Sequence, residues 1–171
     1  MAVPWQACLE QAWAAYRAGS LPIGAVVVDR AGQIVGRGRN RIFEVDAETR
    51  CLSGHRLAHA EVNALISVDH ATVNIKECAL YTTLEPCALC VGAIRMLALK
   101  DVRYAASDPA AGSLSLLEAT EFMRRGLVQP QHLEQPDLEA VLIAINTEAL
   151  IRATRPHRRA SSWPRGYDLV G

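Results

Sequence analysis

The sequence predicts an α/β fold in which one sheet carries helices on its faces. Some segments repeat apolar residues at helical spacing, whereas others are short β-branched runs that are typical of buried strands. Up to Ala106 the two kinds of segment follow the order α-β-β-α-β-α-β. Strands that alternate with helices indicate a sheet covered by helices.

The N-terminal segments predict a helix followed by two strands. Apolar spacing places the helix over residues 5–18. An apolar run that is rich in valine predicts a buried strand over 23–28. A turn at 29–32 then leads to a second strand over 33–38.

The middle of the chain contains a polar segment and then four alternating elements. Residues 39–56 predict a long loop, and a loop of this length in a compact domain is often functional. The expected elements that follow are a helix over 57–68, a strand over 78–83, a helix over 87–99 and a strand over 102–106. The first of these helices is predicted from the spacing of Leu57, Val62, Leu65 and Ile66.

The patterns after Gly112 are weaker. We expect a short helix over 115–125, an edge strand over 128–133 that Pro130 interrupts, and a final helix from Pro136 through Leu150. The length of 171 residues suits one domain. We therefore expect a single domain over 1–153 and an irregular, basic tail over 154–171 that could cover a site as a lid.

The composition and net charge indicate which kinds of partner to expect. The chain is 50% hydrophobic and 21% charged, which is ordinary for a folded domain. Lys and Arg together number 18, as do Asp and Glu, so the net charge does not indicate a nucleic-acid partner. The stretch from Arg152 to Arg165 nevertheless holds five arginines and no acid.

The N-terminus and the apolar runs indicate the cellular location to expect. Glu10 and Gln11 stand where the apolar core of a secretory signal would lie, and no apolar run is long enough to span a membrane. The five cysteines are an odd number, and two form a Cys-x-x-Cys pair, which favours metal or redox work over structural disulfides. We expect a cytoplasmic protein without a membrane partner.

Two short motifs indicate a metal site. One is His59-Ala60-Glu61, and the other is Pro86-Cys87-Ala-Leu-Cys90. Each is expected at a helix start, where free N–H groups favour thiolate over thiol. One imidazole and two thiolates suit zinc, and three protein ligands leave the fourth position open, as in catalytic zinc sites.

Glu61 has the chemistry of a proton shuttle. It lies two residues from His59 and can reach across the helix start toward the metal. Zinc lowers the pKa of water to about 7. A carboxylate there can take up the proton and later deliver it to a departing amine.

The paired motifs H-x-E and P-C-x-x-C are the signature of zinc deaminases, and the sequence resembles the cytidine and deoxycytidylate deaminase superfamily. Within it, the chain looks similar to the branch of tRNA adenosine deaminases, guanine deaminases and fungal-type cytosine deaminases. The stretches that carry the resemblance are Leu21–Val28, Gly38–Asn40, His59–Glu61 and Leu80–Ala93.

The resemblance implies a three-layer α-β-α sandwich around a mixed five-stranded sheet. It implies one Zn²⁺ per chain on His59, Cys87 and Cys90, with Glu61 as the catalytic acid and base. It also implies a homodimer with active sites near the interface. The positions that it marks for substrate binding are Asn40, Ala60, Glu85, Asp108, Trp163 and Tyr167.

Other readings of the motifs stay open. Cys87 and Cys90 could be a redox dithiol, although such a motif would lack the paired His-x-Glu. His55 and His59 could share a helix face. Cys51 or His55 could fill the fourth zinc position and make a structural module without catalysis, but such a module needs no acid at Glu61.

The reaction class is better defined than the substrate. A long segment from Asn40 to His59, a short loop around Asp108 and zero net charge favour a free guanine or cytosine, or a nucleoside. The basic stretch that begins at Arg152 instead favours tRNA and adenosine deamination. The deaminase of riboflavin synthesis also carries His-Ala-Glu-Val, but it usually spaces its cysteines more widely.

Overall fold

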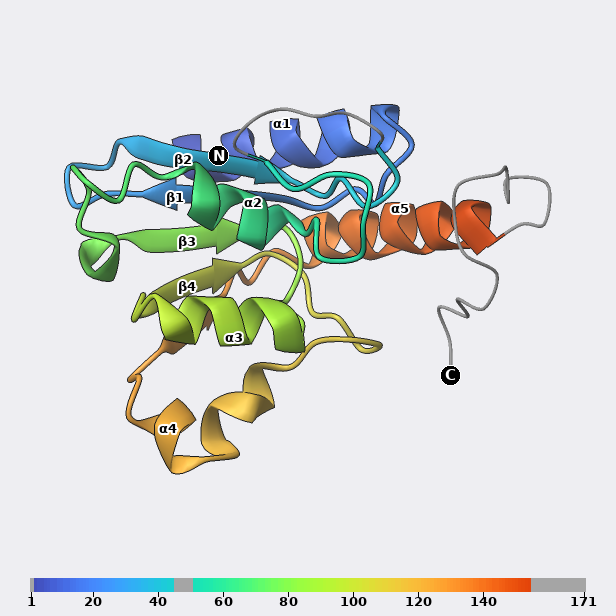
Figure 1. The fold of residues 1–171 in the computed structure, drawn as a ribbon. Coiled ribbons are helices and arrows are strands. Elements are labelled where there is room, and N and C mark those ends of the chain that lie inside the picture. Colours follow the sequence, from blue (N-terminus) through green and yellow to red (C-terminus); the bar gives the residue numbers. More distant parts are fainter. Residues whose placement is uncertain (1, 45–50, 155–171) are drawn as a thin grey trace.

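The fold was analysed in a computed structural model that describes residues 2–44 and 51–154 (Figure 1). Its five strands form one sheet in the order β2-β1-β3-β4-β5. The strands are β1 (Gly24–Val28), β2 (Ile34–Arg39), β3 (Ala79–Thr82), β4 (Asp101–Tyr104) and β5 (Gln129–His132). β1 is antiparallel to β2 and β3, whereas β4 is parallel to β3 and β5. The mixed five-stranded sheet is therefore confirmed.

Helices cover both faces of this sheet, which confirms the three layers (Figure 1). On one face, α2 (Ala60–Ser67) and α3 (Ala88–Met96) pack on a core that includes Val27, Leu80 and Val102. On the other face, α1 (Val3–Arg17) and α5 (Pro136–Thr154) pack on alternate residues of the same strands, among them Val26 and Tyr81. Successive side chains of a strand point to opposite faces, so each central strand serves both cores.

The helix expected over 57–68 begins only at Ala60, and the apolar spacing that predicted it was partly wrong. Leu57 and Ile66 are 52% and 42% exposed. The face that packs on the sheet consists instead of small residues, Ala60 and Ala64, together with Leu65. Small residues are needed because α2 lies close against β2: a Cβ on Gly38 would lie 2.2 Å from the Ala60 carbonyl oxygen.

This close approach predicts a large effect from one methyl group. Gly38→Ala should lower the free energy of unfolding by about 2 kcal/mol, because backbone of α2 would have to move. Gly92→Ala is the control, since a Cβ there meets nothing within 4 Å and the residue lies within α3. Denaturant unfolding of both variants measures the difference, and equal midpoints would contradict the close packing of α2 on β2.

The last third of the chain follows its predicted order with one change. The helix expected over 115–125 is divided into a 3-10 helix, η2 (Leu114–Glu118), and α4 (Glu121–Arg124). Thr120 separates them because its backbone is extended and its side chain caps α4 by accepting a hydrogen bond from Met123 N. β5 contains Pro130 and forms the sheet edge, as expected.

A further 3-10 helix, η1 (Ile75–Glu77), precedes β3. None of the helices in residues 2–44 and 51–154 has the length and apolar character that crossing a membrane requires.

Candidate metal centre

The starts of two helices meet near the C-terminal end of β3, where Thr82 contacts Glu61 of α2. His59 is the N-cap of α2 and Cys87 is the N-cap of α3, and both have extended backbone. Cys90 lies three residues after Cys87, within the first turn of α3. Both motifs therefore lie at helix starts, as expected, although α2 begins at Ala60 and not at 57. At a helix start the dipole stabilises thiolate.

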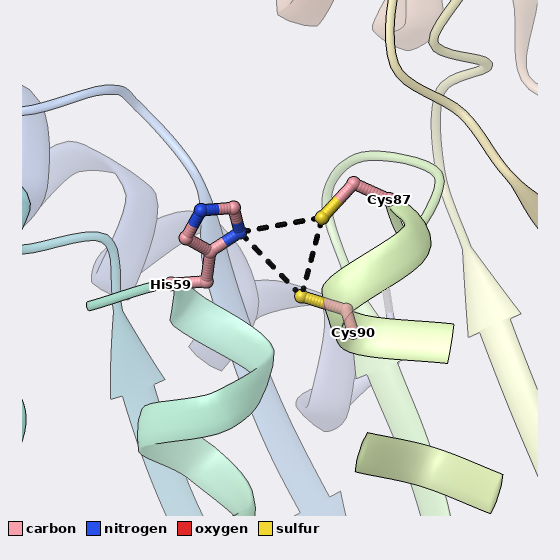
Figure 2. Close-up of side chains that lie close together, drawn as sticks. All are labelled: His59, Cys87 and Cys90. Atoms are coloured by element: carbon pink, nitrogen blue, oxygen red, sulfur yellow. Dashed lines mark hydrogen bonds between the residues drawn. The ribbon is translucent and has the colours of Figure 1, made fainter. Parts of the chain in front are cut away.

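The three side chains converge on one point (Figure 2). His59 Nδ1 lies 3.4 Å from Cys87 Sγ and 3.5 Å from Cys90 Sγ, and the two sulfurs are 3.7 Å apart. Ordinary zinc bond lengths in a tetrahedron require separations of about 3.6 Å between nitrogen and sulfur and about 3.8 Å between sulfurs. The donor set therefore fits a single tetrahedral zinc ion.

The cluster consists of three protein donors. Across the described ranges, His59, Cys87 and Cys90 are the one group of His, Cys, Asp or Glu side chains whose ligand atoms lie close enough to share an ion. His55 lies in the turn before α2, where its Nδ1 accepts a hydrogen bond from Leu57 N, so it shares no helix face with His59. Three donors are the number typical of catalytic zinc.

The charges in the cluster suit a cation. The hydrogen bond with Cys90 and the one with His59 lower the pKa of the Cys87 thiol to about 4. The hydrogen bond with Cys87 raises the pKa of His59. The hydrogen bond with Cys87 raises the pKa of Cys90, and burial adds a smaller increase. Cys87 is therefore a thiolate at neutral pH, which is the form that binds metal.

The Glu61 carboxyl lies against the same cluster. It is 4% exposed, and its Oε2 accepts a hydrogen bond from Cys90 Sγ at 3.3 Å. Its Oε1 accepts a hydrogen bond from Thr82 Oγ1 at 3.2 Å. Burial raises the pKa of this carboxyl above its ordinary value. A carboxyl with a raised pKa exchanges protons more readily near neutral pH.

Asn40 follows the end of β2 and is 1% exposed. The next residue, Arg41, donates its backbone N–H to the Ala58 carbonyl at 2.9 Å, which places this turn beside the chain that leads into His59. The side-chain Oδ1 of Asn40 accepts hydrogen bonds from Ser20 Oγ and Ile42 N. Asn40 therefore lies within a local hydrogen-bond network, in a turn beside the segment that leads into His59.

Glu85 and Asp108 lie together beside Cys87. The Glu85 carboxylate accepts hydrogen bonds from the backbone N–H groups of Asp108, at 3.3 Å, and Leu114, at 3.4 Å. A β-bridge between Cys87 and Gly112 fixes the same loop to the start of α3. These contacts hold the 108–114 loop next to the metal cluster.

The backbone of Glu85 and the side chain of Asp108 have structural partners. Glu85 N donates to the Ala106 carbonyl oxygen at 2.8 Å, so this backbone N–H already has a partner within the fold. Asp108 Oδ1 accepts from Ala110 N and Ala111 N, as in an ordinary Asp turn. Ala60 is fully buried at the start of α2. Trp163 and Tyr167 lie outside the described residues.

Sequence reasoning missed two residues that contact the site. Thr82 resembles any strand residue, and Ser20 resembles any turn residue after a helix. Only the three-dimensional contacts to Glu61 and Asn40 distinguish them.

Comparison with known proteins agrees with this geometry. Residues 4–106 match the family model for the cytidine and deoxycytidylate deaminase zinc-binding region. The chain belongs to this family. Because the family model describes a zinc-binding region, zinc is the metal that this chain is expected to hold. The three-donor cluster of His59, Cys87 and Cys90 is its candidate site.

Curated relatives match this family region over different shares of their length. A tRNA(Ile)-lysidine synthase of Deinococcus radiodurans is 40% identical over 96 residues, which are 55% of this chain and 15% of that protein. A tRNA-specific adenosine deaminase of Rickettsia bellii is 35% identical over 109 residues, which are 62% of this chain and 70% of that protein. The first relative thus shares only a small part of its length with this deaminase-family chain.

Solved structures show the same fold. A structure from a study of tRNA:A34 deaminases superposes with a TM-score of 0.63 at 24% identity and covers 85% of this chain and 97% of that one. A guanine deaminase from Bacillus subtilis has a TM-score of 0.51 at 32% identity and covers 63% of this chain and 66% of that one. The deaminase-family fold is therefore shown by structure as well as by sequence.

Proposed function

We propose that this chain catalyses the zinc-dependent hydrolytic deamination of an exocyclic amino group on a nucleobase. The observation that carries the proposal is the buried Glu61 carboxyl beside a three-donor set with tetrahedral zinc spacing. A structural zinc site needs no acid at that place, whereas hydrolysis of a carbon–nitrogen bond needs a group that moves protons.

The side chains then have distinct roles. When bound, zinc lowers the pKa of water to about 7 and so supplies a nucleophile at neutral pH. Thr82 holds Oε1 of Glu61, which leaves Oε2 on the side of the metal donors as the proton-carrying atom. Glu61 takes one proton from the attacking water and transfers it to the ring nitrogen. It then takes the second proton from the hydroxyl newly bonded to the carbon, which becomes a carbonyl, and delivers that proton to the amine. A carbon–oxygen bond forms, the carbon–nitrogen bond breaks, and ammonia leaves.

For the substrate we favour a free nucleobase or nucleoside of the guanine or cytosine type. The net charge of zero supports a small substrate, because proteins that follow a phosphate backbone usually gather Lys and Arg. The similarity to a guanine deaminase agrees with this choice. The second candidate is adenosine in tRNA, favoured by the 35% identity to a tRNA-specific adenosine deaminase.

One substrate panel separates the candidates. Zinc-loaded protein is incubated with guanine, cytosine, adenine, their nucleosides and unmodified tRNA, and released ammonia is measured. Release from a base or nucleoside supports the favoured substrate class, and release from tRNA alone supports the second candidate. No release from any member of the panel would contradict the proposed function.

We also propose that the chain forms a homodimer through the outer surface of α3 and α4. Met96 at the end of α3 is 73% exposed and Phe122 in α4 is 53% exposed. The Arg95 guanidinium lies 4.1 Å from the centroid of the Phe122 ring, and its Nε donates to the Phe122 carbonyl at 2.8 Å, so the two helices form one surface. Exposed apolar residues on a joined surface favour association.

The homodimer predicts a change in mass. Met96→Glu should convert the dimer to a monomer in light scattering coupled to size-exclusion chromatography, because a charge would be buried without a partner. Val141→Glu is the control, since Val141 on α5 is also exposed, at 56%. If Met96→Glu stays a dimer, or if both Met96→Glu and Val141→Glu become monomers, the proposed interface is contradicted.

A further inference from the structure

Ser20 lies where the end of α1 meets the turn after β2. Gly19 has φ +84°, a conformation that suits glycine and ends the helix. This turn buries Ser20 to 1% exposure and directs its hydroxyl toward Asn40. Ser20 N donates to the Ala15 carbonyl at 2.9 Å, so the backbone of Ser20 is fixed by α1.

Two backbone N–H groups determine the direction of the hydrogen bonds in this turn. Phe43 N donates to Ser20 Oγ at 3.3 Å, which leaves the hydroxyl hydrogen of Ser20 for another acceptor. That hydrogen goes to Asn40 Oδ1 at 2.9 Å. Ile42 N also donates to Asn40 Oδ1, at 3.2 Å. A backbone N–H can only donate, so the atom of Asn40 that faces Ile42 must be the oxygen.

The opposite end of the amide is then the nitrogen. Nδ2 of Asn40 makes no hydrogen bond to any residue in the described parts of the chain, and it is not among the buried side-chain atoms that lack a partner there. Although Asn40 is only 1% exposed, this nitrogen is the part of the amide that keeps hydrogens to donate to a ligand. The turn that carries Asn40 lies beside the segment that enters His59, because Arg41 N donates to the Ala58 carbonyl.

We propose that Ser20 is a positioning residue that fixes the Asn40 amide with Nδ2 as a donor to the substrate. The group of the substrate that faces Asn40 is then a hydrogen-bond acceptor, either a carbonyl or hydroxyl oxygen or an unprotonated ring nitrogen. This inference rests on the proposed function. It adds a residue that acts through Asn40 and defines the chemistry of the substrate at that position.

A double-mutant cycle tests whether Ser20 acts through Asn40. Ser20→Ala should lower kcat/KM by about tenfold on the substrate that the panel identifies. In an Asn40→Ala background the same change should have less than about twofold effect, because the amide that Ser20 orients is gone. Equal losses in both backgrounds would overturn the positioning role. Asn40→Asp keeps the acceptor oxygen and removes the donor, so unchanged kcat/KM in that variant would overturn the acceptor requirement.

Ser67→Ala is the matched control. Ser67 Oγ accepts from Arg37 N at 2.9 Å and donates to the Ala64 carbonyl at 2.8 Å, so it makes the same kinds of bond as Ser20. It lies at the far end of α2, about 12 Å from His59 at the rise of an α-helix. Loss of stability without loss of kcat/KM is expected there. An equal loss of kcat/KM would show that both hydroxyls have structural roles only.

A measurement without substrate keeps this inference separate from the proposed function. The side-chain amide signals of Asn40 are assigned in ¹H–¹⁵N spectra of the zinc-loaded protein by their loss in Asn40→Ala. Ser20→Ala should shift or broaden these signals, and Ser67→Ala should leave them in place. Unchanged signals in Ser20→Ala would overturn the inference even if the protein deaminates its substrate. A shift without activity on any substrate would support the Ser20–Asn40 contact and contradict the proposed function alone.

Discussion

Glu61→Gln should retain zinc and the folded structure but lose about a thousandfold or more in kcat. Gln has the shape of Glu and keeps an oxygen that can accept the Thr82 hydrogen bond, so Thr82 and the three metal donors stay in place. It cannot accept and return a proton, and proton transfer by a placed side chain contributes about 10²–10⁴-fold. Ammonia release measures turnover, and elemental analysis measures the zinc content.

Glu77→Gln is the control for this substitution. Glu77 is exposed in η1, before the start of β3 and so at the opposite end of that strand from Thr82, and it pairs with Arg30 at 3.5 Å. Its loss should leave kcat unchanged. Wild-type turnover in Glu61→Gln would remove Glu61 from the mechanism, and a loss of zinc in that variant would assign it a structural part in the site.

Cys87→Ala should cost both the metal and stability. The Sγ of Cys87 lies within 3.4–3.7 Å of the other two donors, so its removal leaves two ligands for the ion. A metal that binds only the folded chain at 100 to 1,000 times its Kd adds about 2.7–4.1 kcal/mol to the free energy of unfolding. We expect Cys87→Ala to lose most of that increment when unfolding is measured with excess zinc.

Cys78→Ala separates metal binding from packing. Cys78 is also buried, at 4% exposure, but it lies in the core and belongs to no metal cluster in the described parts of the chain. Its substitution should lower stability equally with zinc and with a chelator. Stability of Cys87→Ala that equals wild type in excess zinc would show that the cluster holds no ion.

The sequence predicts most of the fold because its elements have strong and different periods. The strand predicted over 23–28 contains three successive valines, and the helical spacing predicted from Pro136 through Leu150 lies within α5. The start of α2 was misplaced because Leu57 extends the apolar spacing into a turn. Periodicity alone could not show that the close approach to Gly38 selects alanines for the buried face.

The sequence also predicts the members of the metal cluster, since His59, Cys87 and Cys90 stand in short motifs with fixed spacing. It does not predict the residues around them. Thr82 is 21 positions from Glu61, and Ser20 is 20 positions from Asn40. Such pairs depend on how β3, α1 and the turn after β2 assemble, and no local pattern records that assembly. The expected contributions of Trp163 and Tyr167 stay predictions.

A zinc titration of metal-free protein tests the central claim most directly. Chelator-treated protein is given increasing zinc, and ammonia release from the substrate that the panel identifies is measured at each step. The proposed function predicts activity that is near zero without zinc, rises linearly and reaches a plateau at one zinc per chain. Full activity in the metal-free protein would contradict it, as would a chain that binds one zinc and releases no ammonia from any substrate.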